Sequence, residues 1–573
     1  MSMNRVRFCI FLVVVVIVGL VAFGVGSTPQ VQKATSSQFS AERVVEDIRE
    51  ISKHHHSVAH PVERKVVRDY LVKRLSEIGA DTVELFEYKS LTGPENKHVT
   101  YTFDATNVLA TFNCKQASEA QTFLLLVAHY DSRYSQPMPK KDTVWSYGAA
   151  DDGYGVGVIL ESVTQALKYR DSWKQGVKVL FTDAEEVGMK GMKAMWQNNR
   201  EVFEDVGLMI NIEARGPFGP ALLFETSPGN ERLMELYKTA AEYPFTYSLT
   251  TVVYNFMPNF TDFTIVKDEI PGMNFSTIAD INHYHTDLDN FDNINPKSIQ
   301  HYGSQIAPIV HKYLTEEKFS ELNYLKSDRD TINFTLPLLG LFNFQWSGYL
   351  WLNIAIFVLF ILSFAVESLR GRVQIAKALS QTLKTLLSAL LALVVGEVIA
   401  YLCSAIAGAS FKMFGIVQGV TFDNAVMIAS AVVMVVVASV VHILQRRDIF
   451  RRTSNSLRAS AGASAVQIYT TNKLYGTLTL LLVLSCLLLV FIRENLMFFI
   501  PLFAATLSVV TYRIVKIKEL LLLAISLILL HALSFLYALT MALTIGAFGV
   551  VLMLALLDVL VVIPLAELYL SKQ

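Results

Sequence analysis

Long apolar runs fill the second half of the chain, and they constrain its fold more than any other feature of the sequence. From Tyr349 onward most residues belong to such runs, and a helix needs about 20 apolar residues to cross the hydrocarbon layer of a bilayer. Residues 30–319, in contrast, have the mixed composition of a water-soluble domain. The sequence therefore predicts a membrane protein with a large water-facing domain.

One more apolar run precedes the soluble region, at residues 8–26, and Arg5 and Arg7 stand before it. It is long for the apolar part of a cleaved signal peptide, so we interpret it as an uncleaved signal anchor. Seven further spans are expected after the soluble region, at residues 349–366, 385–406, 425–444, 474–492, 496–512, 520–541 and 544–565.

The basic residues outside the soluble region predict the orientation of these spans. Sixteen lysines and arginines fall on one side of the expected membrane, and only Lys412 and Arg493 fall on the other. Basic residues collect on the cytoplasmic side, so both termini are predicted to be cytoplasmic and the soluble domain to be extracytoplasmic. The expected organisation is a cytoplasmic N-terminus (1–7), a transmembrane signal anchor (8–26), a linker (27–38), a soluble domain (39–318), a connector (319–348), a membrane domain of about seven helices (349–565) and a cytoplasmic tail (566–573).

The overall composition excludes several classes of protein. The 573 residues are 52% hydrophobic and 17% charged, with a net charge of −1. This composition excludes a disordered chain and argues against nucleic acid as a partner. Only Cys114 of the four cysteines lies in the soluble region, so no disulfide framework can form there. Any chemistry must depend on other side chains.

The soluble region alternates strand and helix signals. Strands separated by helices predict an α/β fold with a mostly parallel sheet covered by helices, in which ligands bind at the carboxyl ends of the strands. Short apolar runs predict buried strands at 107–112, 123–128, 177–181, 208–212 and 221–224, and helical periodicity predicts helices at 41–52, 62–75, 155–167 and 230–241.

Residues of metal-binding type follow the predicted strands in order. Each one alone is most simply a helix cap or a solvated loop residue, but five such segments in a row predict a single site. Histidine and carboxylate ligands suit zinc, and a shared carboxylate lets two ions lie about 3.5 to 4 Å apart. The residues are His129 and Asp131 in AHYDS, Asp151 and Asp152 in GAADDGYG, Asp183, Glu185 and Glu186 in FTDAEEVG, Glu213 and Arg215 in INIEARG, and His283, His285, Asp287 and Asp289 in NHYHTDLD.

This series resembles the motifs of a known family. The order H-x-D, D-D/N before a glycine-containing turn, E-E-x-G, an acidic residue after a strand, and H-T is similar to that of the co-catalytic zinc metallopeptidases of the aminopeptidase Y and glutamate carboxypeptidase type. The resemblance covers residues 39–314. One anchor, a peptidase-like domain, a multispan region and the NIEARG segment further resemble the membrane-bound subgroup of vacuolar membrane protease and endoplasmic reticulum metallopeptidase, with its bacterial relatives.

The resemblance implies a set of metal ligands around two Zn²⁺ ions. His129 and Glu213 would bind the first ion, Glu186 and His285 would bind the second, and Asp151 would bridge the two. Glu213 departs from the aspartate that is common among soluble members of the family.

The resemblance also implies roles for residues beside the metals. Glu185 would be the general base and acid in metal-assisted amide hydrolysis, and Asp131 would orient the His129 imidazole. His283 fits the pattern less well and is interpreted as structural. Tyr154 stands where the family often has a small serine.

The expected function is that of a membrane-anchored dizinc metallopeptidase that hydrolyses peptides on the extracytoplasmic or lumenal side. Among such enzymes, an aminopeptidase is favoured. The alternatives are a catalytically inactive peptidase-like receptor or transport component, and an aminoacyl cyclase of related fold. We expect a bacterial plasma membrane, with an endoplasmic reticulum or vacuolar membrane as the alternative. The oligomeric state stays open.

Four other features have less definite interpretations. Arg215 could recognise a substrate carboxylate, or could form a salt bridge to Glu213 or to a neighbouring loop. The histidines at 54–56, with His60, are interpreted as loop surface rather than a third metal site. Asp262 has a spacing that gives no decisive signal. The ionisable residues expected in or near the spans are interpreted as hydrogen-bonding between helices or lining a small wet cavity, with a polar path or lipid site as the alternative; they are Glu397, His442, His531 and Asp558.

Overall fold

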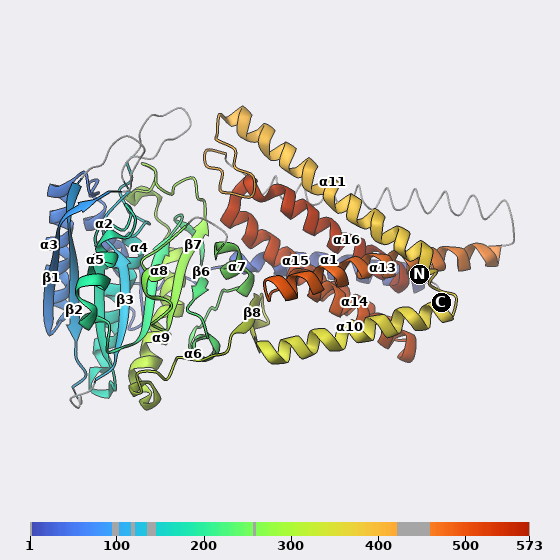
Figure 1. The fold of residues 1–573 in the computed structure, drawn as a ribbon, viewed down its shortest axis with the longest axis horizontal. Coiled ribbons are helices and arrows are strands. Elements are labelled where there is room, and N and C mark those ends of the chain that lie inside the picture. The colour runs from blue at the N-terminus through green and yellow to red at the C-terminus, as the bar shows by residue number, and fades with distance from the viewer. Residues whose placement is uncertain are drawn as a thin grey trace. The chain divides into compact units, whose positions relative to one another are not determined.

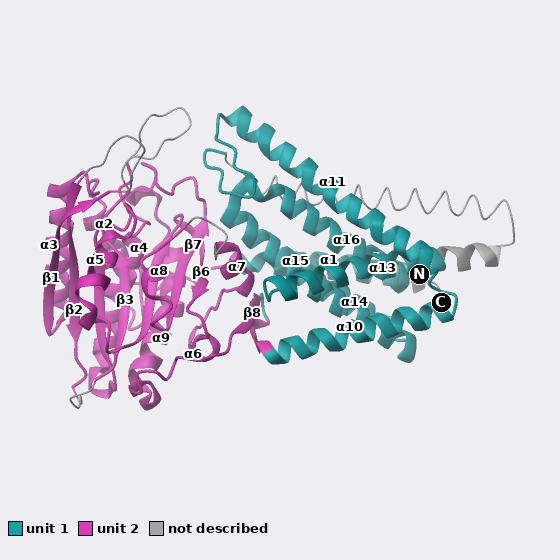
Figure 2. Ribbon diagram, in the orientation of Figure 1, with its two compact units in different colours: residues 1–25, 336–338, 347–573 teal, residues 26–335, 339–346 magenta. Residues whose placement is uncertain are grey.

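The computed structural model describes residues 3–93, 102–115, 121–133, 145–255, 259–420 and 459–571 (Figure 1). The chain divides into two compact units (Figure 2). One unit contains residues 26–335 and 339–346 and has an α/β fold. The other contains residues 1–25, 336–338 and 347–573 and is helical.

A seven-stranded sheet forms the centre of the α/β unit, with the strand order β1-β2-β4-β3-β5-β7-β6. The four central strands β4, β3, β5 and β7 are parallel, and antiparallel pairs close the sheet on both sides. The strands are β1 (Thr82–Thr92), β2 (Thr102–Phe112), β3 (Phe123–His129), β4 (Gly176–Thr182), β5 (Val206–Ala214), β6 (Phe218–Thr226) and β7 (Gly272–Ala279), and β8 (Thr331–Leu336) pairs separately with β9 (Gly340–Gln345).

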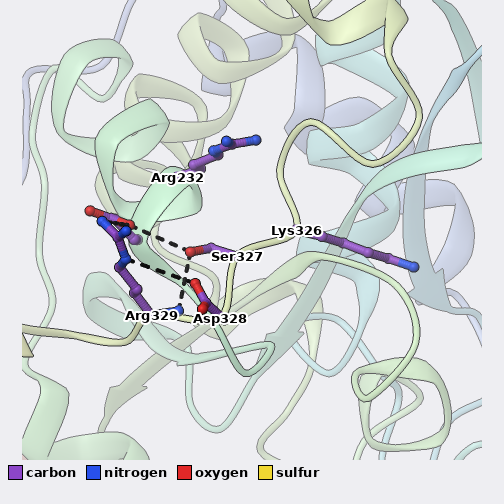
Figure 3. Close-up of a pocket in the computed structure, with 6 residues that line it drawn as sticks. Arg232, Lys326, Ser327, Asp328 and Arg329 are labelled. Atoms are coloured by element: carbon purple, nitrogen blue, oxygen red, sulfur yellow. Dashed lines mark hydrogen bonds and ion pairs between the residues drawn. The ribbon is translucent and has the colours of Figure 1, made fainter.

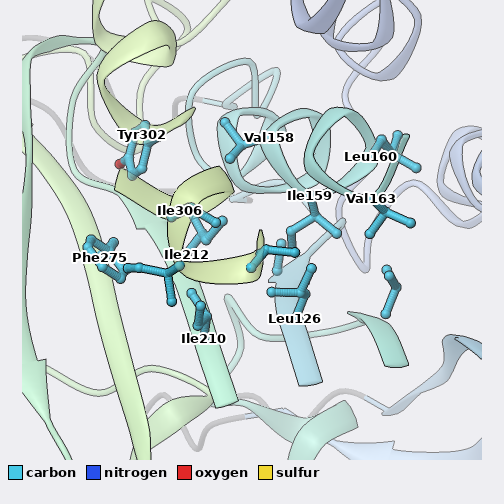
Figure 4. Packing of buried hydrophobic residues seen from close by; sticks show 14 of the residues in the cluster. Leu126, Val158, Ile159, Leu160, Val163, Ile210, Ile212, Phe275, Tyr302 and Ile306 are labelled. Atoms are coloured by element: carbon cyan, nitrogen blue, oxygen red, sulfur yellow. The ribbon is translucent and has the colours of Figure 1, made fainter. Parts of the chain in front are cut away.

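Helices cover both faces of the sheet. Alternate residues of β3 enter different cores: Leu126 packs with residues of α4 and α9 such as Ile159 and Ile306 (Figure 4), whereas Val127 packs with residues of α5 and α8. The central strands are therefore held from two sides. The helices are α2 (Ala41–Ile51), α3 (Pro61–Ile78), α4 (Gly153–Ala166), α5 (Lys190–Asn198), α6 (Glu231–Ala240), α7 (Ser248–Asn255), α8 (Phe263–Val266) and α9 (Pro296–Thr315).

The fold class expected from the sequence is confirmed, with two additions. The parallel part of the sheet is its centre, and the antiparallel pairing of β1, β2 and β6 at the edges was not predicted. Strand β7 and helix α9 were not predicted either. Their apolar periodicity is interrupted by buried polar residues such as Asn274 in β7 and His301 in α9, which have hydrogen-bond partners inside the fold.

Long apolar helices make up the other unit. Six described stretches are long and apolar enough to cross a membrane, by length and composition; one of them, Glu519–Leu570, comprises α15, a short 3₁₀ turn and α16. The predicted span at 425–444, and His442 within it, lie outside the described residues. The helices are α1 (Met3–Phe23), α10 (Trp346–Leu369), α11 (Ile375–Ala407), α13 (Ala459–Phe491), α14 (Leu496–Val515), α15 (Glu519–Leu543) and α16 (Phe548–Leu570).

The ionisable residues expected in the spans lie on these helices. Glu397 of α11 packs against Gly549 of α16, where an added Cβ would lie 2.6 Å from Glu397 Oε1, so the glycine makes room for the carboxyl group. His531 of α15 and Asp558 of α16 are both buried.

Candidate metal centre

The five predicted ligands lie at one edge of the sheet. His129 is the last residue of β3, Glu186 follows β4, Glu213 is near the end of β5, and His285 follows β7. All four strands are the central parallel ones, so their carboxyl ends meet at the same edge. Asp151 lies there too, in the segment that leads from β3 into α4.

Asp151 stands between two sets of ligand atoms. Its Oδ1 lies 3.2 Å from Nε2 of His129, which is 3.7 Å from Oε2 of Glu213. Its Oδ2 lies 3.2 Å from Nε2 of His285, which is 3.1 Å from Oε2 of Glu186. Within each set the ligand atoms all lie within 4.8 Å of one another. The structure thus brings all five predicted residues together, with Asp151 common to both sets.

A hydrogen bond at Nδ1 orients the His129 ring, so that Nε2 faces the carboxylates of Asp151 and Glu213. Nδ1 donates to the backbone carbonyl of Asp131 at 2.9 Å, because a carbonyl oxygen can only accept. Burial lowers the pKa of His129, but the carboxylates of Asp131, Asp151 and Glu213 outweigh this effect and hold the pKa well above its usual value. Groups that attract a proton to Nε2 would equally attract a metal cation there.

The carboxylate of Asp131 has a different main contact from the one expected. Its Oδ1 lies 3.7 Å from Nδ1 of His129, beyond hydrogen-bond distance. Instead, Oδ1 accepts a hydrogen bond from the backbone N–H of Glu185 at 2.9 Å, and Oδ2 accepts one from Glu186 at 3.3 Å. Asp131 therefore holds the His129 ring through its carbonyl and the two glutamates through its carboxylate.

The adjacent glutamates have different surroundings. Glu186 is buried, and its Oε2 pairs with His285 and lies 3.3 Å from Nη1 of Arg133. The Glu185 carboxylate is half-buried and forms no hydrogen bond or ion pair with the described residues. Burial raises the pKa of Glu185 well above its usual value, and the nearby carboxylate of Glu213 acts in the same direction. The Arg133 contact could not be recognised in the sequence, because nothing in its spacing distinguishes it.

A series of side-chain hydrogen bonds connects Glu213 to Lys267. Asn211 Nδ2 donates to Glu213 Oε1 at 3.0 Å and to Asn274 Oδ1 at 3.0 Å. Asn274 in turn donates to Glu225 at 3.0 Å, and Glu225 pairs with Lys267 at 2.6 Å. These contacts fix one oxygen of Glu213 and leave Oε2 facing His129. Burial raises the pKa of Glu213 to about 8, although the charge of His129 acts against this.

The Asp151 loop is held by Asp289, which the sequence placed among the residues of metal-binding type without giving it a separate role. Asp289 accepts a hydrogen bond from the backbone N–H of Ala150 at 2.7 Å and another from the Ser146 hydroxyl at 2.9 Å. Asp152 caps α4 by accepting from the Gly155 N–H at 3.0 Å. The Tyr154 hydroxyl, which is buried, donates to the Pro217 carbonyl at 3.0 Å and so ties α4 to the segment after β5.

Four other predictions can be compared with the structure. The interpretation of the 54–56 histidines as loop surface is wrong for His56, which is buried and whose N–H donates to the Ser132 hydroxyl at 3.1 Å. His283 pairs with Asp280 at 3.2 Å. Asp262 is buried and accepts from the Thr182 hydroxyl. The side chain of Arg215 forms no ion pair or hydrogen bond with any described residue, so neither salt bridge considered as its alternative role, to Glu213 or to a neighbouring loop, is found there.

The donor set fits zinc. His129, Asp151, Glu186 and His285 are each at least nine-tenths buried, and buried carboxylates are costly unless paired or bound to metal. Asp151 Oδ2 and Glu186 Oε1 have no hydrogen-bond donor among the described residues, although both are shielded from solvent. Histidine nitrogen and carboxylate oxygen are common zinc ligands.

Comparisons with known proteins agree with the motifs. Residues 107–310 match the family model of Peptidase family M28. The chain is 29% identical over 226 residues to Endoplasmic reticulum metallopeptidase 1 of Mus musculus, which covers 38% of this chain and 23% of that protein. It is 27% identical over 323 residues to Vacuolar membrane protease of Candida dubliniensis, which covers 55% of this chain and 32% of that protein. The family resemblance inferred from the sequence is confirmed.

The matched region spans about a quarter to a third of these curated relatives' length. Both are named for internal membranes, so the expected bacterial plasma membrane is not supported. Solved structures that resemble the chain include a Zn-dependent exopeptidase from Parabacteroides distasonis, with 20% identity, a TM-score of 0.37 and coverage of 48% of this chain and 98% of that one. A glutaminyl cyclase from Porphyromonas gingivalis has 20% identity, a TM-score of 0.37 and coverage of 48% and 99%.

Proposed function

We propose that this chain, which carries a Peptidase family M28 domain, is a membrane-anchored dizinc metallopeptidase that removes amino-terminal residues from peptides. One observation supports this proposal most strongly. The two carboxylate oxygens of Asp151 face different histidines, and each histidine faces a second carboxylate. A carboxylate placed in this way suits a pair of cations.

The ligands of the proposed centre divide into two sets. His129 and Glu213 would hold one Zn²⁺, Glu186 and His285 would hold the other, and Asp151 would contribute one oxygen to each. Zinc bound in this way supplies a Lewis acid that polarises a peptide carbonyl and lowers the pKa of a water molecule.

Glu185 is the proposed general base and acid. Its carboxylate is the one at the site that has no protein partner among the described residues, and it is partly open to solvent. It can therefore take a proton from the attacking water and return it to the leaving amine. Asp131 holds the backbone at Glu185 and so positions this carboxylate.

The acidic side of the site favours an amino terminus. The carboxylates of Glu186 and Glu213 lie close enough to that of Glu185 for their charges to interact, and a protonated amine is the part of a peptide that such a group attracts. An aminopeptidase is therefore preferred to a peptidase that requires a blocked amino terminus.

The helical unit would place this domain at a membrane, on the side away from the cytoplasm. The excess of basic residues on one side of the expected spans supports this orientation. The relatives' names favour an internal membrane such as that of the endoplasmic reticulum or vacuole, with the peptidase domain in the lumen.

The test combines metal analysis with an activity panel on the purified full-length protein. We expect two zinc ions per chain and release of the first residue from unblocked peptides, with no release from amino-terminally acetylated ones. Zinc without hydrolysis of any peptide would contradict the proposal in favour of a binding protein. Loss of ammonia from peptides that begin with glutamine, without peptide cleavage, would show an aminoacyl cyclase instead.

A further inference from the structure

An unpaired arginine lies beside the candidate metal centre. Arg215 directly follows β5, and its backbone N–H donates to the Thr277 carbonyl of β7 at 3.0 Å, so its position is fixed by the sheet. The side chain is partly exposed, and it contacts no carboxylate or carbonyl among the described residues. An arginine held in place without a partner is available to a ligand.

An unpaired hydroxyl is found in the same part of the unit. Tyr254 of α7 packs its ring against Phe224 of β6, with the ring centroids 4.9 Å apart. The residue is only 8% exposed, yet its hydroxyl has no hydrogen-bond partner among the described residues. A buried hydroxyl without a partner costs free energy unless a ligand or water satisfies it.

Both groups are close to the residues of the site. Arg215 follows Ala214, which pairs with Thr277 of β7, and Tyr254 packs against Phe224 of β6, the strand on the other side of β7. Burial raises the pKa of the Tyr254 hydroxyl; the carboxylates of Glu225 and Glu213 add to this effect, whereas the Arg215 charge opposes it.

Three acidic groups in this part of the unit have partners other than Arg215. Glu186 pairs with Arg133 and His285, and Glu225 pairs with Lys267. Glu213 accepts from Asn211. The Glu185 carboxylate has no partner in the described part of the chain, and no ion pair joins it to Arg215.

We propose that Arg215 and Tyr254 form a subsite for a carboxylate of the substrate. A guanidinium and a hydroxyl that both donate to one carboxylate give a charge-assisted contact, which is stronger than one between neutral groups. This inference rests on the proposed peptidase function and names its substrate class. The substrate is a peptide with a carboxylate near the cleaved bond, supplied either by the free carboxyl terminus of a dipeptide or by an acidic side chain.

The experiment compares matched substrates on the purified, zinc-loaded full-length protein. The dipeptide Ala-Ala is compared with its amide, which tests the free carboxyl terminus. The amides of Ala-Glu and Ala-Gln, and those of Glu-Ala and Gln-Ala, test an acidic side chain on either side of the cleaved bond. We expect kcat/KM for the charged member of at least one pair to exceed that of its neutral partner by about tenfold or more.

Substitutions then assign this preference to the subsite. Arg215→Gln should bring the preferred pair to a ratio of about one, because kcat/KM should fall more for the charged member than for the neutral one. Tyr254→Phe should reduce the ratio without abolishing it. Arg215→Lys keeps the charge without the planar fork and should give an intermediate ratio. Zinc content should stay at the wild-type value in all three variants, which shows that the centre is intact.

Arg232 provides a matched control. It lies on α6 and lines a surface pocket with Lys326, Asp328 and Arg329 (Figure 3), so Arg232→Gln should leave every ratio unchanged. Equal rates on the charged and neutral members of every pair would overturn the subsite while leaving the peptidase proposal intact. So would an Arg215→Gln variant that keeps its zinc but slows both members alike. A wild-type protein that cleaves no peptide would overturn both proposals.

Discussion

The carboxylate of Asp151 lies between two imidazoles, with Oδ1 3.2 Å from Nε2 of His129 and Oδ2 3.2 Å from Nε2 of His285. This arrangement predicts that both metal positions depend on one residue. Asp151→Ala should lower the zinc content from two ions towards none and should abolish turnover. Elemental analysis of the purified variant measures this. Asp292→Ala, at an exposed position, is the control, and a variant at Asp151 that keeps both ions would refute the bridging role.

The unpartnered Glu185 and the paired Glu186 should respond in opposite ways to the same substitution. Glu185→Gln removes the proton acceptor, so turnover should fall about 10²- to 10⁴-fold while the zinc content stays near two. Glu186→Gln weakens a ligand, so zinc should be lost together with activity. The two assays on both variants separate these roles. If Glu185→Gln lost zinc and Glu186→Gln kept it, the roles would be exchanged.

The Asn211 side chain should affect metal affinity although it is not a ligand. Asn211→Ala leaves Oε1 of Glu213 without its donor and disconnects the chain to Lys267, so zinc should bind about 10- to 100-fold more weakly. Competition with a chelator measures this. Asn198→Ala is the control, because the Asn198 side chain donates to the Ala194 carbonyl of its own helix. Unchanged affinity in Asn211→Ala would show that packing alone positions Glu213.

His301 makes the stability of the α/β unit depend on pH. It is buried in α9, its Nδ1 accepts from the Ala221 N–H at 3.0 Å, and burial lowers its pKa from 6.5 to about 3. Below pH 6.5 the unfolded chain gains a proton that the folded chain does not, so this residue should lower the free energy of unfolding by about 1.4 kcal/mol per pH unit down to about pH 3.

Thermal unfolding of His301→Asn between pH 7 and 5 tests this dependence. Asparagine keeps an acceptor but does not titrate, so its midpoint should decline less steeply with falling pH than that of the wild type. Parallel declines in the two proteins would assign the pH dependence to other groups.

The proposed orientation predicts which surface positions a membrane-impermeant thiol reagent can reach. In a background without Cys9, Cys114, Cys403 and Cys486, a cysteine at Asp292 should react only when the reagent reaches the lumenal side. A cysteine at Leu369, which is 89% exposed at the end of α10, should react from the cytoplasmic side. The reverse pattern would contradict the orientation derived from basic residues.

The ligands could be predicted from the sequence because His129, Glu186 and Glu213 come at the ends of short apolar runs or just after them, and all five follow the order of a known series of motifs. The partners that orient them could not. Asn211 and Asn274 lie inside strands and meet only when β5 and β7 pair. Arg133 follows β3 and contacts Glu186, which follows β4 and is 53 residues away in the sequence.

For some residues, the surroundings in the structure differ from those that the sequence suggested. His56 belongs to a run of three histidines that resembles surface, yet it is fixed to the strand end that carries His129. Arg215 shows the opposite case, since its side chain, which could have paired with Glu213, has no partner among the residues that the structure describes. Both outcomes depend on contacts between distant segments, which periodicity does not report.

Asp131 holds the peptide groups of Glu185 and Glu186, not their side chains. Because these hydrogen bonds involve only backbone N–H groups, a substitution of either side chain leaves them in place. In the proposed centre, a mutation of Glu185 would therefore abolish hydrolysis while zinc stays bound. Evolution could convert such an enzyme into a binding protein in a single step, without first having to dismantle its scaffold.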